Sequence, residues 1–211
     1  MRLLRPVSED EVVAAFLRAE GDGETGRNGA LIVSRLGADD EPADTVARPD
    51  LSDPRQNAYR RRLLGEIRGF GRGDGMFIGF PSQVDWHRAA LLRDEVLEVR
   101  YINDRASDDY WVTLSGGSRR PLDAAARIRA GIGPEWAIGV WDLSGCAAVV
   151  TRLCQGSLPE LIVATDPRVG RVVAVEGNGR LTSFALCRER LPEVVEVFCA
   201  IAEGLDSWGL Y

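Results

Sequence analysis

The sequence contains no lysine, because all 26 basic residues among its 211 are arginine. A Walker-A lysine, a Schiff-base lysine and a lysine general base are therefore excluded. A bound phosphate would have to meet arginine, backbone N–H groups or a metal ion. A GC-rich genome also favours arginine, so the bias does not by itself indicate a function.

Histidine is almost absent as well, and the cysteines form no metal-binding pattern. His87 is the single histidine, which excludes a site built from several histidines. It lies in "VDWHRAALL", which we interpret as the start of an amphipathic helix, so a packed or surface role is favoured over a Ser–His–Asp triad. No CxxC pair occurs, and we expect reduced, buried, structural cysteines. They are Cys146, Cys154, Cys187 and Cys199.

Long apolar runs are also missing, and none reaches the length that crosses a bilayer. The N-terminal "MRLLRPVSEDEVV" does not follow the pattern of a signal peptide, so we expect a cytoplasmic protein without a membrane partner. A formal net charge of -6 argues against nucleic acid as a partner. The 45% hydrophobic content is enough for a globular core.

The first 130 residues are predicted to mix helices and strands. A Ser8–Glu11 capping box begins the first helix, and Pro54 fits the first turn of the second. The glycines at 69–75 indicate a flexible turn, and 37–53 a surface loop. Helices are expected at 8–20, 54–70 and 84–93, and a further helix after the glycine turn that begins 115–131. Strands are expected at 29–36, 76–80 and 109–114, and one more within 94–103.

The C-terminal part alternates more clearly, and "GIGP" (131–134) is the best candidate boundary. We therefore predict an α+β fold with a mixed β-sheet and flanking helices. Residues 1–130 would form an α/β region of unknown role and 131–211 a second domain, unless both are one compact unit. Strands are expected at 136–143, 158–166, 171–176 and 193–201. Helices are expected at 144–156 and 179–190, the first of them capped by Ser144 and ended by Gly156.

The stretch "VVAVEGNGRLTSFAL" (172–186) places an acid, two glycines and an arginine between a strand and a helix. Free N–H groups and the helix dipole favour an anion there, and Arg180 can grip phosphate oxygens. Glu176 can accept a proton as a catalytic base or hold Mg²⁺. The alternative is an ordinary tight turn that binds nothing.

A second stretch, "YWVTLSGGSRRPLDAAARI", has the same expected form of strand, glycine turn and helix. If both turns face one cleft, Arg119 and Arg180 would clamp a polyphosphate together. The residues of this turn are Ser115, Gly116, Gly117, Ser118 and Arg119, of which Ser118 fits an N-cap equally well.

Acidic and aromatic side chains beside these turns are weaker candidates. Asp108 and Asp109, next to Tyr110, offer metal or substrate contacts. The aromatic side chains are expected to pack in the core or at its edge rather than stack on bases. They are Trp111, Trp136, Trp141 and Trp208.

Residues 135–203 resemble the ParB/sulfiredoxin-like superfamily. The resemblance rests on Gly156, "LPELIV", "VVAVEGNGR", "LTSFAL" and "EVVEVF", in that order. The whole chain is also similar to a bacterial family of uncharacterised proteins with an "EGHxRLTA" motif. The superfamily implies nucleotide handling, with phosphates held by the turn and its helix: Gly177, Asn178, Gly179, Arg180 and Thr182.

Three departures from the superfamily pattern matter. The sulfiredoxin cysteine is absent, since Asn178 and Gly179 stand in the turn, which argues against sulfinic-acid reduction. Gly179 also replaces the usual histidine, which fits weakened catalysis with binding kept. No helix–turn–helix segment follows residue 203, which argues against DNA partition.

Three functions are therefore considered. The first is an enzyme that uses ATP or CTP with Mg²⁺ for phosphoryl transfer to, or hydrolysis near, a small hydroxylated metabolite. The second is a non-catalytic nucleotide-sensing or DNA-modification accessory module. The third is a structural or interaction domain in which both glycine turns only shape the fold.

Overall fold

A single five-stranded sheet organises the computed structural model, which describes residues 1–23, 25–106, 110–133 and 141–211. The strands lie in the order β1-β2-β5-β3-β4. Strands β3 and β5 are parallel, and the other neighbouring pairs are antiparallel. The strands are β1 (Arg2–Pro6), β2 (Asp85–Leu92), β3 (Leu161–Thr165), β4 (Val172–Glu176) and β5 (Val194–Ile201).

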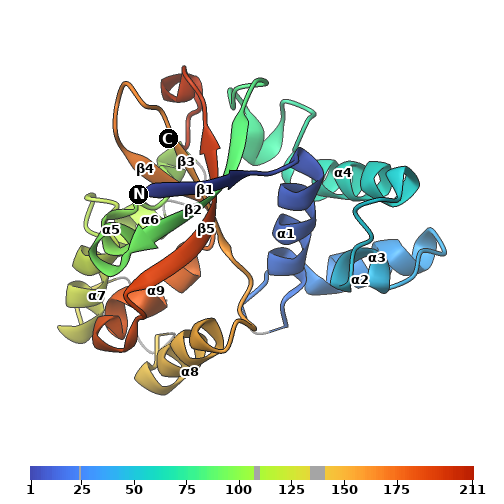
Figure 1. The fold of residues 1–211 in the computed structure, drawn as a ribbon. Helices are drawn as coiled ribbons and strands as arrows, with labels where there is room; N and C mark the ends of the chain where they lie inside the picture. The colour runs from blue at the N-terminus through green and yellow to red at the C-terminus, as the bar shows by residue number, and fades with distance from the viewer. Residues whose placement is uncertain (24, 107–109, 134–140) are drawn as a thin grey trace.

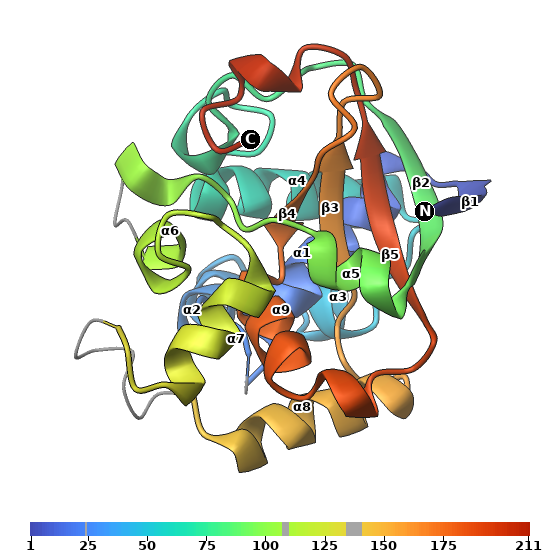
Figure 2. The same cartoon turned by 90° about the vertical axis from the view of Figure 1, so that its left-hand side faces the viewer.

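Helices cover both faces of the sheet, so the protein has three layers (Figures 1 and 2). Side chains alternate along each strand, as Val163 shows by packing into one core while Ile162 packs into the other. One face packs against α5 (Arg93–Glu98), α6 (Tyr110–Leu114), α7 (Pro121–Arg129), α8 (Leu143–Cys154) and α9 (Asn178–Leu186). The other packs against α1 (Glu9–Gly21), α2 (Gly29–Ala38), α3 (Asp44–Ala47) and α4 (Pro54–Arg68).

The predicted α+β class with a mixed sheet is confirmed, and the segments from α8 to β5 lie where the sequence placed them. Ser8 caps α1 by accepting from the Glu11 N–H at 3.2 Å, and Asp53 caps α4. The sheet takes β1 and β2 from residues 1–130 and the other strands from residues 131–211.

Two segments have a different secondary structure from the one that the sequence predicts. The expected strand at 29–36 is helix α2, which buries Ile32 and Leu36 four residues apart and leaves Val33 70% exposed. The expected helix at 84–93 is β2, and His87 lies opposite Cys199 of β5. Pairing of β2 with β5 along its whole length outweighs the helical preference of an alanine- and leucine-containing segment.

The expected strand at 109–114 is also wrong, because residues 110–114 form α6. The Asp104 carboxylate accepts from the N–H groups of Trp111 and Val112 at 2.8 and 3.2 Å and thereby caps this short helix. This cap comes from outside the segment, so the segment's own residues did not predict it.

Four smaller predictions are corrected as well. Residues 75–77 form a 3₁₀ turn instead of a strand, and the segment after Glu98 contributes an isolated bridge from Arg100 to Val173. Asp142, not Ser144, caps α8. Cys154 is exposed, while the other three cysteines are buried.

Part of the sequence interpretation falls on residues outside the described ranges. The predicted strand at 136–143 begins there, and Trp136, Asp108 and Asp109 lie there too. In the described part of the chain, no helix combines the length and apolarity needed to cross a membrane.

Candidate functional site

The turn between β4 and α9 has the form that the sequence predicts. Gly177 is the N-cap of α9, with a left-handed φ of 103°, and gives the helix no side-chain cap. A Cβ at this position would lie 2.3 Å from Leu161 Cδ2 and 3.0 Å from Arg180 Nε. The turn therefore requires glycine for its backbone angle and for the space beside it.

Glu176 and Arg180 form an ion pair across this turn. Arg180 Nη2 donates to Glu176 Oε1 at 3.0 Å, and its Nη1 donates to the Pro159 carbonyl at 3.1 Å. The Arg180 side chain is 2% exposed and that of Glu176 19%. Burial raises the pKa of the Glu176 carboxyl, and the charge of Arg180 opposes that rise. Arg180 is thus engaged by the protein itself, which changes its predicted role as a free phosphate clamp.

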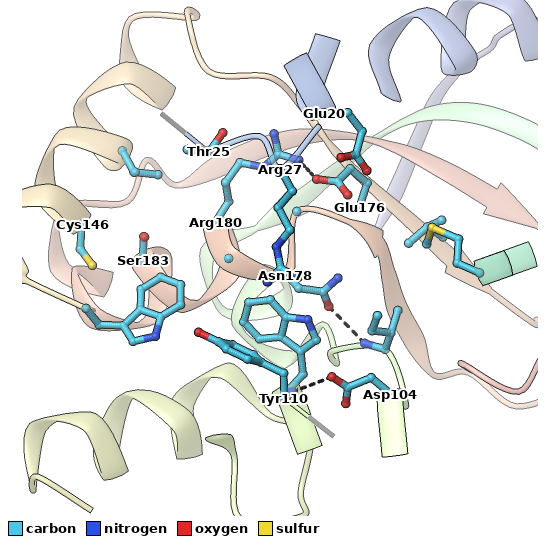
Figure 3. A pocket seen from close by; sticks show the side chains of 18 of the residues that line it. Glu20, Thr25, Arg27, Asp104, Tyr110, Cys146, Glu176, Asn178, Arg180 and Ser183 are labelled. Carbon is cyan, nitrogen blue, oxygen red and sulfur yellow. Dashed lines mark hydrogen bonds and ion pairs between the residues drawn. The ribbon is translucent and has the colours of Figure 1, made fainter. Parts of the chain in front are cut away.

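A cavity of about 920 Å³ opens in front of the turn. It lies between the β4–α9 turn, the loop after α1, the end of α4, helix α6 and the start of α8 (Figure 3). Glu176, Gly177, Asn178, Gly179 and Arg180 all line it. The turn singled out from the sequence therefore forms one wall of this cavity, while the other walls come from distant segments.

Aromatic rings form the wall opposite α9. Trp111 packs against Tyr110 with ring centroids 4.7 Å apart, and Trp141 lies 6.4 Å from Trp111. A Cβ on Gly179 would lie 3.6 Å from Trp141 and 3.9 Å from Trp111. The first turn of α9 thus lies beside two indole rings, which give this part of the cavity an apolar wall.

Arg27 brings a positive charge over this aromatic wall. Its guanidinium carbon lies 5.6 Å from the ring centroids of both Tyr110 and Trp111, within cation–π range. The residue is exposed, and within the described ranges it has no ion-pair partner. Figure 3 shows its side chain in the cavity between Glu176 and Asn178.

A second ion pair supports this part of the cavity. Glu20 is 1% exposed and accepts from Arg68 Nε and, at 2.7 Å, from Asn28 Nδ2. Asn28 directly follows Arg27, so the Glu20 carboxylate ties the loop that carries Arg27 to α4. Sequence reasoning missed these residues, because Glu20 and Arg68 are 48 positions apart and neither segment has a motif.

The second glycine turn does not join this site. Its residues, 115–119, do not line the cavity, and the turn follows helix α6 instead of a strand. The N–H groups of Gly116, Gly117 and Arg119 bond to Thr113 O, Val112 O and Ser115 Oγ. These donors are used within the protein, so the expected phosphate cradle is absent from this described turn.

Arg119 and Ser118 have structural partners. Arg119 is 8% exposed, and its Nη1 donates to the main-chain oxygen of Tyr211 at 2.7 Å. Burial and the charges of Arg171 and Arg100 lower the pKa of Arg119 to about 10. Ser118 Oγ accepts from the Arg120 N–H at 3.1 Å, beside the start of α7. The two predicted arginine clamps therefore do not converge.

Thr182 lies behind the site and does not line the cavity. Its hydroxyl oxygen is 2.7 Å from the Tyr101 hydroxyl and donates to the Asn178 carbonyl at 3.2 Å. Among the described residues, no cluster of three or more His, Cys, Asp or Glu side chains is placed to hold a metal ion. A cation at Glu176 would lie beside the Arg180 guanidinium, so the residues do not favour Mg²⁺ bound by Glu176 itself.

Comparison of the chain with protein-family models, with curated proteins and with solved structures found no match.

Proposed function

We propose that the protein binds a nucleotide in the cavity in front of the β4–α9 turn. The observation that carries this proposal is the meeting of three kinds of group around one space. The first backbone N–H groups of α9 have no side-chain cap among the described residues, Arg27 adds a positive charge, and Trp111 and Trp141 add a flat apolar wall. Phosphate suits a helix N-terminus beside an arginine, and a base suits an aromatic wall.

The size and lining of the cavity support this ligand class. A volume of about 920 Å³ lies in the usual range for small-molecule and cofactor sites. The sequence of residues 135–203 also resembles that of nucleotide-handling proteins, and this resemblance is independent of the size of the cavity.

Catalysis is the second step of the proposal. Glu176 is the residue proposed to accept a proton from a small hydroxylated substrate, because burial raises the pKa of its carboxyl. Mg²⁺ is proposed to arrive with the phosphates of ATP or CTP, since the described residues do not favour a site built on Glu176.

The Glu176–Arg180 ion pair favours the second candidate, a nucleotide-sensing module without turnover. Arg180 holds the only carboxylate of the predicted motif at 3.0 Å, and a base needs that carboxylate free to reach the substrate. Turnover therefore separates the two functions, while binding is common to both.

The test is a calorimetric titration of ATP and CTP into the full chain, followed by a nucleotide hydrolysis assay. Arg27→Ala is expected to weaken binding by about tenfold to a hundredfold, the effect of losing a hydrogen bond to a charged group. Arg2→Ala, which removes the same charge from β1 at an edge of the sheet, serves as control and is expected to change nothing. If neither nucleotide binds the wild-type chain, the proposed function is wrong.

A further inference from the structure

The side-chain amide of Asn178 stands at the first position of α9 with one end fixed and the other facing the cavity (Figure 3). Its Oδ1 accepts from the main-chain N–H of Ile102 at 3.1 Å. A backbone N–H only donates, so this bond determines which end of the amide is the oxygen. The NH₂ end is therefore the one left for the cavity.

This NH₂ group is a donor that meets no acceptor among the described residues. Asn178 is 7% exposed, and among the described residues nothing accepts a hydrogen bond from Nδ2. Asn178 lines the cavity, where this NH₂ group can donate to water or to a ligand atom. The Ile102–Asn178 bond joins α9 to a segment 76 positions earlier, so the amide is held by tertiary structure.

We propose that Asn178 is a specificity-determining residue of the cavity, whose Nδ2 donates to an acceptor atom of the ligand. The proposal rests on the proposed nucleotide function and adds which chemistry the ligand presents at the start of α9. That chemistry is a lone pair on an atom without hydrogen. A phosphate oxygen and a carbonyl oxygen or ring nitrogen of a base both supply it.

The decisive variant is Asn178→Asp. Aspartate has the same shape and keeps an oxygen for the Ile102 N–H, but it replaces the NH₂ donor by a second acceptor. A purely structural Asn178 would tolerate the change, whereas a ligand acceptor would face an oxygen instead of a donor. Ala148→Asp is the matched control, because exposed Ala148 also lines the cavity and the change adds the same charge without removing a donor.

Titrations with ATP, CTP, adenosine, cytidine and inorganic pyrophosphate are carried out on the wild-type chain and both variants, with a melting curve for each. Asn178→Asp is expected to weaken binding at least tenfold more than Ala148→Asp. Weaker pyrophosphate binding identifies a phosphate oxygen as the acceptor, and a loss limited to the nucleosides and nucleotides identifies the base or sugar. Equal affinities of the two variants would overturn the role of Asn178 while leaving the nucleotide function intact.

A measurement on the wild-type chain covers the case in which Asn178→Asp does not fold. The side-chain NH₂ resonances of Asn178 are followed by NMR during titration with the tightest-binding probe. They are expected to shift strongly and exchange more slowly with water when Nδ2 donates to the ligand. Unchanged resonances at saturation would overturn the proposal, and a wild-type chain that binds none of the probes would overturn it together with the proposed function.

Discussion

Substitution of Gly177 by alanine tests the geometry on which the whole site depends. The left-handed φ of 103° costs an alanine about 1–2 kcal/mol. The new Cβ would also lie 2.3 Å from Leu161 Cδ2, and Leu161 is only 2% exposed in the core. Such overpacking costs about 1–3 kcal/mol, because the leucine cannot turn away into solvent. We expect the free energy of unfolding to fall by about 2–5 kcal/mol in total.

Urea unfolding measures this loss, and Gly170→Ala provides the matched control. Gly170 also has a left-handed φ, of 70°, but nothing lies within 4 Å of a Cβ at that position. Gly170→Ala therefore has the free-energy cost of a left-handed φ without a close contact of the new Cβ. The difference between the two variants isolates the Leu161 overlap, about 1–3 kcal/mol. Equal losses in both variants would refute the reasoning about space, and no loss in either would refute the turn geometry itself.

Three further predictions concern the ion pairs and buried arginines. Arg180→Ala leaves the Glu176 carboxylate buried without its partner, so the free energy of unfolding, measured by urea titration, should fall by about 3–5 kcal/mol. Adding Glu176→Gln to the same chain removes the unpaired charge and should restore part of the lost stability. Burial opposes ionisation of Asp22, but hydrogen bonds from Arg152 and Thr25 outweigh it and lower its pKa to about 2. The stability that this carboxylate contributes is present above its ordinary pKa of 3.8 and is lost as the pH falls toward 2, so Asp22→Asn should flatten the pH dependence of unfolding in that window. Arg119→Ala should lower stability by about 1.5–3 kcal/mol and leave nucleotide affinity unchanged in calorimetry, whereas weakened binding would return this residue to the site.

Local sequence determined the C-terminal half of the sheet and one wall of the site. Runs such as "LIVAT" and "VVAVE" combine β-branched residues with flanking turns, and both are strands. The two glycines and the arginine of "EGNGR" predicted a strand-to-helix turn, because backbone angles and free N–H groups at a helix start depend on neighbouring residues alone.

Tertiary structure alone decided the elements whose stability comes from distant partners. The segment 85–92 is a strand because β5 pairs with it, and residues 110–114 are a helix whose first N–H groups bond to Asp104. Local propensity is a weak preference that one such partner can outweigh.

The same division holds within the candidate site. The sequence identified Glu176 and Arg180 but not that they form an ion pair with each other, and it did not connect Arg27, Glu20 or Arg68 with them. Motifs record residues that are close along the chain. The charge balance of a cavity depends instead on which side chains the packing of α1, α4, α6 and α9 brings within a few ångströms of one another.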